Sequence, residues 1–186
     1  MREVEAVKDE SELSTVSVLL TKRYGEQMAD IWNFGVNVAL RISDLLNIQL
    51  ADIKGDKLVI QEGKTDKKAN ILLNSKALEI VNSVRSRDPD SIYLFQSRRS
   101  RNITNKPAKP LTRQAVSAAF KDVGETLDIA LGTHSMRKTR GYHLYKKTND
   151  IARVMKMLRH SSEAVTLRYI GITQDDIDND FNELIL

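Results

Sequence analysis

The chain has 186 residues, which suffices for one domain with a substantial hydrophobic core. Hydrophobic residues make up 41% and charged residues 29% of it, as in water-soluble globular proteins, and the absence of cysteine excludes disulfides and thiolate zinc sites. No apolar run approaches the length of a membrane span, and the polar, acidic N-terminus is unlike a signal peptide, so we expect a cytoplasmic protein.

The net charge of +4 is unevenly distributed along the chain. Residues 134–168 carry nine basic and two acidic residues, and residues 85–113 carry eight basic and two acidic ones. Residues 170–186 carry five acids and no base. Concentrated positive charge favours a polyanion through phosphate contacts and the release of counterions. We therefore expect nucleic acid as the partner.

Apolar residues at helical spacing alternate with polar capping residues along most of the chain. Helices are predicted over residues 10–24, 26–40, 43–47, 75–85, 113–127, 134–147, 150–159, 163–170 and 175–185. The residues expected to cap them are Asp9 or Ser11, Asn74 or Ser75, Thr112, Thr133 and Ser161 or Ser162.

The pattern changes between residues 50 and 73, where short β-prone runs are separated by turn residues. Three strands are predicted over residues 52–53, 57–61 and 69–73. The sequence therefore predicts an α+β fold that is mainly α, with one small antiparallel sheet. We expect residues 1–9 to form a polar tail, residues 10–174 a single domain, and residues 175–186 an acidic, amphipathic tail helix.

The stretch 133–170 concentrates the residues that can do chemistry. His134 and Arg137 are three residues apart and share one face of a helix. His160 follows a second helical pattern, and Tyr169 lies near the end of a third. Cations can hold a phosphodiester while a phenol attacks it, so this combination indicates phosphoryl transfer to a tyrosine.

The runs THSMRKT, MLRHSS and TLRYIG resemble the catalytic core of the tyrosine recombinase (phage integrase) family. The family pattern is His-x-x-Arg, then a second His, then the nucleophilic Tyr. Upstream, ALRISDLL resembles the segment with the family's first catalytic Arg, and EGKTDKKANILL resembles its strand-borne catalytic Lys. The resemblance covers residues 10–175. It implies a helical catalytic domain with a small three-stranded antiparallel sheet, and no N-terminal core-binding domain in this chain.

The resemblance implies that Arg41 and Arg137 clamp the scissile phosphate, that Asp44 supports Arg41, and that His160 donates a hydrogen bond to the phosphate. From the residues alone, Arg41 and Asp44 can equally form a structural ion pair. His160 can equally satisfy the last carbonyls of a helix.

The remaining implied roles concern proton transfer and the attack itself. Lys64, in a turn between strands, would protonate the departing 5′ oxygen, with Lys67 and Lys68 as competitors. His134 would accept or relay the tyrosine proton, or bond the phosphate. Tyr169 would be the nucleophile, although its spacing alone also permits a half-buried core tyrosine.

Further aromatic and small residues complete the comparison with the family. Tyr142 and Tyr145 are expected to pack on the preceding helix. Family members often carry Gly where Ala39 and Arg159 stand. At position 39 we expect a mild change in packing, and at position 159 a changed turn or an added DNA contact.

The implied reaction is a transesterification that gives a 3′-phosphotyrosine, followed by strand exchange and religation without metal, ATP or another cofactor. The implied partner is a double-stranded DNA recombination site in a bacterial or phage-infected cell, near the nucleoid. A homo-oligomer, expected to be a tetramer, would bind that site, and a monomer is allowed in its absence. The basic residues expected to contact DNA are Arg98, Arg99, Arg101, Lys106, Lys109, Arg113, Lys138, Arg140 and Arg159.

Two other functions fit the same fold. A non-catalytic accessory protein could occupy recombination sites, although it need not retain all six catalytic candidates. An enzyme like the type IB topoisomerases would use similar chemistry to relax DNA without strand exchange. The acidic tail helix can pack on its own domain or dock on a neighbouring protomer.

Overall fold

The computed structural model describes residues 3–61, 63, 68–98, 107–173, 182 and 185. Its helices are α1 (Glu10–Tyr24), α2 (Glu26–Val38), α3 (Ile42–Leu46), α4 (Ser75–Arg87), α6 (Arg113–Leu127), α7 (Ser135–Thr148), α8 (Ile151–Leu158) and α9 (Glu163–Ile170), with a 3-10 turn, η1 (Leu50–Asp52). The predicted mainly helical fold is confirmed, with element ends displaced by one or two residues. The predicted tail helix falls almost entirely outside the described residues.

The predicted antiparallel sheet is also confirmed. Its strands are β1 (Ile53–Lys54), β2 (Lys57–Gln61) and β3 (Lys68–Leu72), in the order β1-β2-β3. Leu58 and Ile60 are buried while their neighbours on β2 are exposed, and Ile60 lies opposite the buried Ala69. This alternation fixes the register, because a slip of one residue would turn the apolar side chains to water.

Side-chain caps begin most of the long helices. Each capping oxygen accepts a hydrogen bond from a backbone N–H two or three residues on, and the caps are Asp9, Asn74, Thr112, Asp150 and Ser162. The predicted Thr133 cap is wrong. The residue before α7 is His134, whose backbone is already helical and whose side chain makes no capping bond. Ser135 closes this turn, because its N–H bonds the Gly132 carbonyl and its hydroxyl accepts from the Gly132 N–H.

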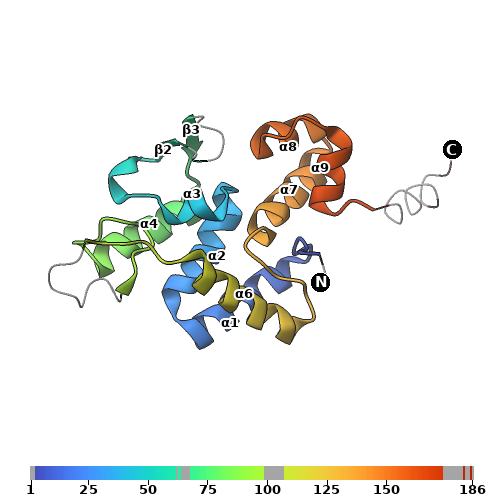
Figure 1. Ribbon diagram of the computed structural model, residues 1–186. Coiled ribbons are helices and arrows are strands. Elements are labelled where there is room, and N and C mark those ends of the chain that lie inside the picture. Colours follow the sequence, from blue (N-terminus) through green and yellow to red (C-terminus); the bar gives the residue numbers. More distant parts are fainter. Residues whose placement is uncertain are drawn as a thin grey trace.

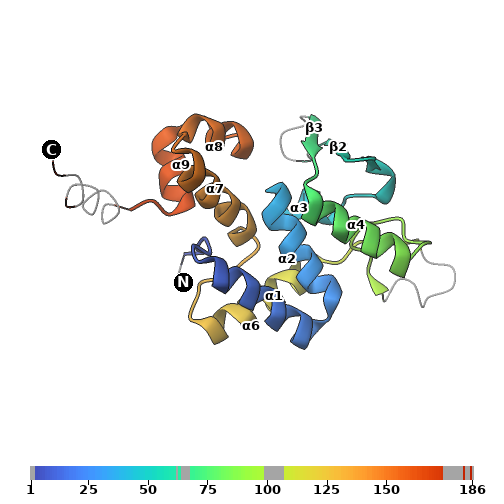
Figure 2. The ribbon, with the colours of Figure 1, turned by 180° about the vertical axis from the view of Figure 1, so that it is seen from behind.

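Two hydrophobic clusters divide the molecule. The larger cluster lies under α1, α2, α4, α6 and the sheet, and contains an edge-to-face pair of Trp32 and Phe120 with ring centroids 5.6 Å apart. The smaller cluster is centred on Val154, Leu158 and Ile170 and holds α7, α8 and α9 together. Figures 1 and 2 show the sheet and α4 on one side and α7–α9 on the other, with α2 between the two sides and α1 and α6 below.

The N-terminal segment was expected to be a polar tail, but residues 3–8 pack on the α7 side of the molecule. The Glu5 N–H bonds the Ala130 carbonyl at 2.9 Å, and the Val7 N–H bonds the Thr139 hydroxyl at 2.9 Å. Val7 is only 1% exposed. The segment is held in place by these backbone hydrogen bonds and by the burial of Val7, although Glu3, Glu5 and Lys8 are charged. Among the helices that the structure describes, none is long and apolar enough to cross a membrane.

Candidate active site

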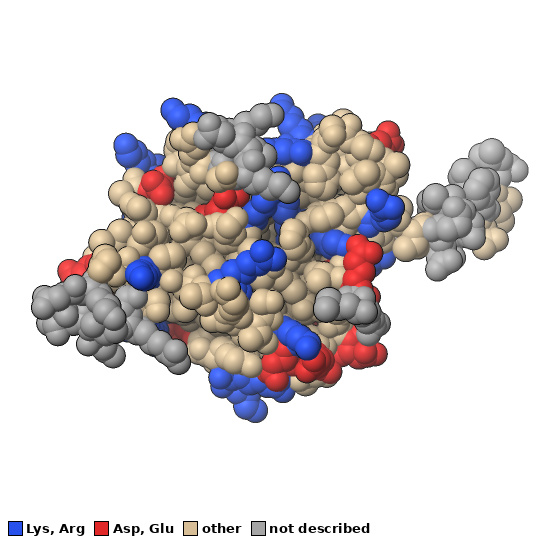
Figure 3. Space-filling model, viewed as in Figure 1, with Lys and Arg blue, Asp and Glu red and all other residues tan. Residues whose placement is uncertain are grey.

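A groove of about 800 Å³ runs between β3 and the α7–α8 side of the molecule. Figure 3 shows Lys and Arg side chains along the middle of this face. The basic residues that line the groove are Lys68, Arg137, Arg140, Lys156 and Arg159, together with His160. The groove is therefore a positively charged surface that can bind an anionic polymer.

Arg137 lies at the inner wall of this groove and is only 4% exposed. Its Nη1 donates to the Ala39 carbonyl at 2.6 Å, and its Nη2 donates to the Leu158 carbonyl. Ala39 directly follows α2 and Leu158 ends α8, so one planar guanidinium on α7 joins three helices. It also donates a hydrogen bond to the hydroxyl of Tyr169.

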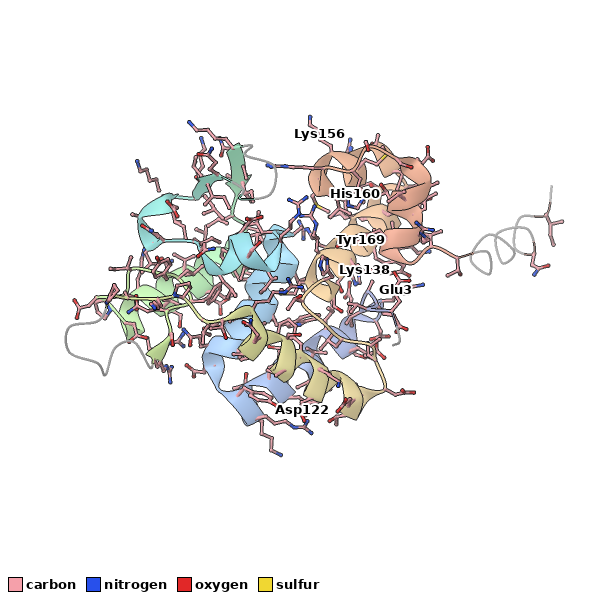
Figure 4. All side chains as sticks on the ribbon, viewed as in Figure 1. Glu3, Asp122, Lys138, Lys156, His160 and Tyr169 are labelled. Atoms are coloured by element: carbon pink, nitrogen blue, oxygen red, sulfur yellow. The ribbon has the colours of Figure 1, made fainter. Side chains whose placement is uncertain are left out.

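Tyr169 is presented to these groups from α9 of the same chain. Its hydroxyl lies 3.3 Å from His134 Nδ1, and its ring meets that of His160 edge to face at 4.9 Å between centroids. Figure 4 shows His160 and Tyr169 close together on the α8–α9 side. The structure thus brings together four predicted site residues: His134 and Arg137 at the start of α7, His160 between α8 and α9, and Tyr169 on α9.

Arg41 precedes α3 and is partly buried. Its positive charge acts on His134, His160 and Tyr169, which places it at the same site. The predicted turn lysine, residue 64, and its competitor at position 67 lie outside the described residues. Lys68 is described and begins β3.

Asp44 was expected to support Arg41. Its described hydrogen bond is instead to the backbone, because Oδ1 accepts from the Gly63 N–H at 3.1 Å. Asp44 is 7% exposed, so this bond is shielded from water. The contact ties α3 to the turn between β2 and β3, immediately before Lys64.

The protonation of the site follows from burial. Burial lowers the pKa of both His134 and His160 below the ordinary histidine value, and nearby arginines lower it further. Both imidazoles are therefore neutral at neutral pH. Burial raises the pKa of Tyr169, while the charges of Arg137 and Arg41 oppose that rise.

The tautomer of His160 follows from its neighbour. The Thr166 hydroxyl donates to the Ser162 carbonyl at 2.6 Å, so its oxygen is left to accept from His160 Nδ1 at 3.2 Å. This assigns the ring proton to Nδ1. His160 can then donate through Nε2 to an anion only when it takes up a second proton, which a bound phosphate favours.

Both positions at which the family often carries Gly have a left-handed backbone. Ala39 has φ 54° and Arg159 has φ 55°. The expected packing change at Ala39 is thus a backbone effect, since a side chain in this region costs about 1–2 kcal/mol. At Arg159 the side chain has a use, because Nη2 donates to the Lys68 carbonyl at 3.3 Å and joins the end of α8 to β3.

The residues expected to contact DNA separate into three groups. The exposed or groove-lining ones are Arg98, Lys109, Arg113, Arg140 and Arg159. Those outside the described residues are Arg99, Arg101 and Lys106. The prediction for Lys138 is wrong, because its side chain is buried and its Nζ lies 2.9 Å from Glu3 Oε1. It follows Arg137 on α7 and is therefore turned by about 100° away from the groove.

Two further lysines line the groove that the sequence did not single out as candidate DNA contacts. Lys68 opens β3, and Lys156 stands exposed on α8, where Figure 4 shows it pointing outward. Lys156 is three residues before Arg159, and this spacing was a usable signal for a shared face. For Lys68 the signal was weak, because a lysine at a strand end is common on any surface.

A helical domain with a small sheet, in which a phenol is surrounded by guanidinium and imidazole groups, is a domain of the tyrosine recombinase catalytic type. The model of the phage integrase family matches residues 20–175. The chain belongs to the phage integrase family.

Individual relatives agree with this assignment. A probable integrase/recombinase of Bacillus subtilis, YoeC, is 38% identical over 144 residues, which are 76% of each chain. The tyrosine recombinase XerA of Pyrococcus furiosus is 31% identical over 72% of this chain and 46% of its own length. XerC of Caldanaerobacter subterraneus is 29% identical over 80% of this chain and 42% of its own. The chain thus spans less than half the length of these two recombinases.

Solved structures share the fold. The crystal structure of XerA recombinase superposes with a TM-score of 0.72 at 17% identity, covering 98% of this chain and 65% of that one. A lambda integrase(75-356) dimer bound to a COC′ core site gives 0.68 at 16% identity, covering 93% and 63%.

Proposed function

We propose that this chain is the catalytic domain of a site-specific DNA recombinase, in which Tyr169 attacks a DNA phosphodiester. The observation that carries the proposal is the position of the Tyr169 hydroxyl, 3.3 Å from His134 and hydrogen-bonded by Arg137, a residue that lines the basic groove. These are the groups that hold a phosphate and receive a phenolic proton. The nucleophile is already present in cis.

In the cleavage step, the Tyr169 oxygen bonds to phosphorus and the bond from phosphorus to the 5′ oxygen breaks. The phenolic proton passes to His134, which is free to accept it because burial keeps that imidazole neutral. The departing 5′ oxygen receives a proton from Lys64, the residue that follows Gly63 in the sequence. The products are a 3′-phosphotyrosine and a free 5′-hydroxyl.

Charge on the non-bridging phosphate oxygens is stabilised by Arg41, Arg137 and protonated His160. Fixed donors of this kind are usually the largest contribution to such catalysis, and removal of one costs about 10²–10³ in rate. The phosphotyrosine retains the energy of the broken bond. The 5′-hydroxyl of another strand can therefore attack it and religate the DNA without ATP.

The proposed substrate is double-stranded DNA that lies along the groove. Related folds include a lambda integrase dimer bound to a COC′ core site and a XerH recombinase bound to a palindromic difH substrate. We extend this arrangement to the present chain. Copies of it would assemble on a recombination site, as a tetramer during exchange, in the cytoplasm of a bacterial or phage-infected cell.

Covalent capture tests the proposal. A nicked duplex library with a randomised central stretch traps the intermediate, because the short strand beyond the cleavage point diffuses away. Wild-type protein should form an adduct that survives denaturation, and sequencing the trapped DNA gives the target site. Tyr169→Phe should form none, whereas Tyr142→Phe, a packing residue of the smaller cluster, should still form it. The absence of an adduct with wild-type protein, or its persistence in Tyr169→Phe, would contradict the proposal.

The captured site then separates recombination from simple relaxation. Two labelled duplexes that carry it should yield exchanged products. Relaxation of a supercoiled plasmid without such products would instead indicate an enzyme of the topoisomerase kind.

A further inference from the structure

Lys138 is a buried cation beside the nucleophile that the cleavage step above does not use. The residue is 6% exposed, and its Nζ lies 5.2 Å from the centroid of the Tyr169 ring. Figure 4 shows His160, Tyr169, Lys138 and Glu3 following one another down this side of the molecule. Burial of an ammonium group is costly unless its surroundings compensate.

Anchoring the N-terminal segment does not account for this lysine. Its ion pair with Glu3 is 2.9 Å long, but the Glu3 side chain is 80% exposed, so water screens the attraction. The segment is already held by the backbone bonds of Glu5 and Val7 and by His143, whose Nε2 lies 3.1 Å from the Val7 carbonyl. Among the residues that the structure describes, the compensation that remains is the aromatic face of Tyr169.

The phenol is therefore contacted on separate sides by different groups. His134 and Arg137 meet its hydroxyl, and the His160 ring meets it edge to face. Lys138 lies over the ring itself. A cation over an aromatic face attracts its π-electrons, and the attraction strengthens when the ring becomes a phenolate, because the negative charge spreads into the ring.

We propose that Lys138 is a positioning residue of this site, which holds the Tyr169 ring in its attacking orientation and favours the phenolate as the proton leaves. The proposal rests on the function proposed above and adds a member to that site. Lys138 contacts the ring of the nucleophile and not the phosphate, so it acts through Tyr169.

The charged groups that face Tyr169 come from every element around it. They are His134, Arg137 and Lys138 on the α7 side, His160 before α9, Arg41 at the start of α3, and, behind Lys138, Glu3 with Arg168 acting on it. The two arginines act from the hydroxyl side. Removing Lys138 alone should thus raise the pKa of the phenol while leaving the two arginines that would bind the phosphate in place.

A fluorine titration tests this without DNA. A ring-fluorinated tyrosine placed at position 169 ionises at a pH where lysine is still charged, and its ¹⁹F signal is separate from the other tyrosines. In Lys138→Met the pKa of this phenol should rise by about one unit relative to the wild-type background. Lys138→Arg, which keeps the charge, should retain at least half of the effect.

Lys8 provides a matched control, because its Nζ lies 5.1 Å from the centroid of a different ring, that of Tyr142. Lys8→Met should leave the fluorine titration at position 169 unchanged. Equal titrations of Lys138→Met and wild type, with both proteins folded by circular dichroism, would overturn the proposal. So would an equal shift in Lys8→Met.

Cleavage of the captured site gives a second readout. Lys138→Met should form the covalent adduct about tenfold more slowly at neutral pH, as one unit in phenol pKa implies. A 5′-bridging phosphorothiolate substrate, whose leaving group needs no proton, should leave that defect in place. Rescue by this substrate would assign Lys138 to the leaving group and overturn the proposal. If wild type forms no adduct, the proposed function fails, while the fluorine titration still decides the role of Lys138.

Discussion

Replacing Arg137 should damage stability and catalysis separately, and the two losses can be measured apart. In Arg137→Met the carbonyls of Ala39 and Leu158 lose their donor, and these residues are 3% and 0% exposed. A buried acceptor left without a partner costs about 1–3 kcal/mol. Two such carbonyls lose their donor, but the variant no longer has to bury a charge, which offsets part of the destabilisation. We therefore expect the free energy of unfolding to fall by about 2–4 kcal/mol.

Arg137→Lys separates charge from geometry. An ammonium group keeps the charge, but it cannot span both carbonyls and the Tyr169 hydroxyl as a planar fork does. We expect about half the stability loss of Arg137→Met, and adduct formation still slowed at least about tenfold, against about 10²–10³ for Arg137→Met. A lysine variant with wild-type cleavage would show that charge alone suffices.

Urea unfolding followed by circular dichroism measures the first loss, and the rate of adduct formation on the captured site measures the second. Arg140→Met is the matched control, because Arg140 is a partly exposed arginine of the same helix and groove. Its unfolding free energy should stay within about 0.5 kcal/mol of wild type. An unchanged urea midpoint for Arg137→Met would refute the reasoning, since the two carbonyls would not depend on the guanidinium.

Three further predictions address the supports of the site. Gly141→Ala should destabilise the protein by about 1–3 kcal/mol in urea unfolding and slow adduct formation, because the new Cβ would lie 2.7 Å from Ile170 Cγ2 and displace α9. If both the unfolding free energy and the rate of adduct formation stayed at wild-type values, α7 and α9 would be shown to move apart without cost. Asp44→Ala should cost about 1–2 kcal/mol and slow cleavage, whereas Asp44→Asn, which can still accept from Gly63, should lose less stability, and equal losses would contradict the assigned bond. Because the pKa of His160 is lowered in the folded state, its protonation favours unfolding, so the melting temperature should fall as pH drops below about 6.5. His160→Asn should make the melting temperature depend less on pH. An unchanged pH dependence in this variant would refute the lowered pKa of His160.

Local sequence patterns determined much of this molecule. Asp9, Asn74 and Thr112 cap the helices that they were expected to cap, and the alternation on β2 fixed which face of the sheet is buried. These features depend on residues close together in the chain, so their physics can be read without the fold. The order of the site residues was equally readable, because their types and spacing match one family.

Only the tertiary structure decided what lies beside each residue. Helical spacing places Lys138 on a different face of α7 from Arg137. Whether that face is buried depends on residues 3–8, which are distant in sequence. Asp44 was assigned to Arg41 because they are close in sequence, whereas its carboxylate bonds Gly63 on another element. Helical periodicity determines in which direction a side chain points from its own helix. Which residues it meets there depends on how the separate helices and strands pack together.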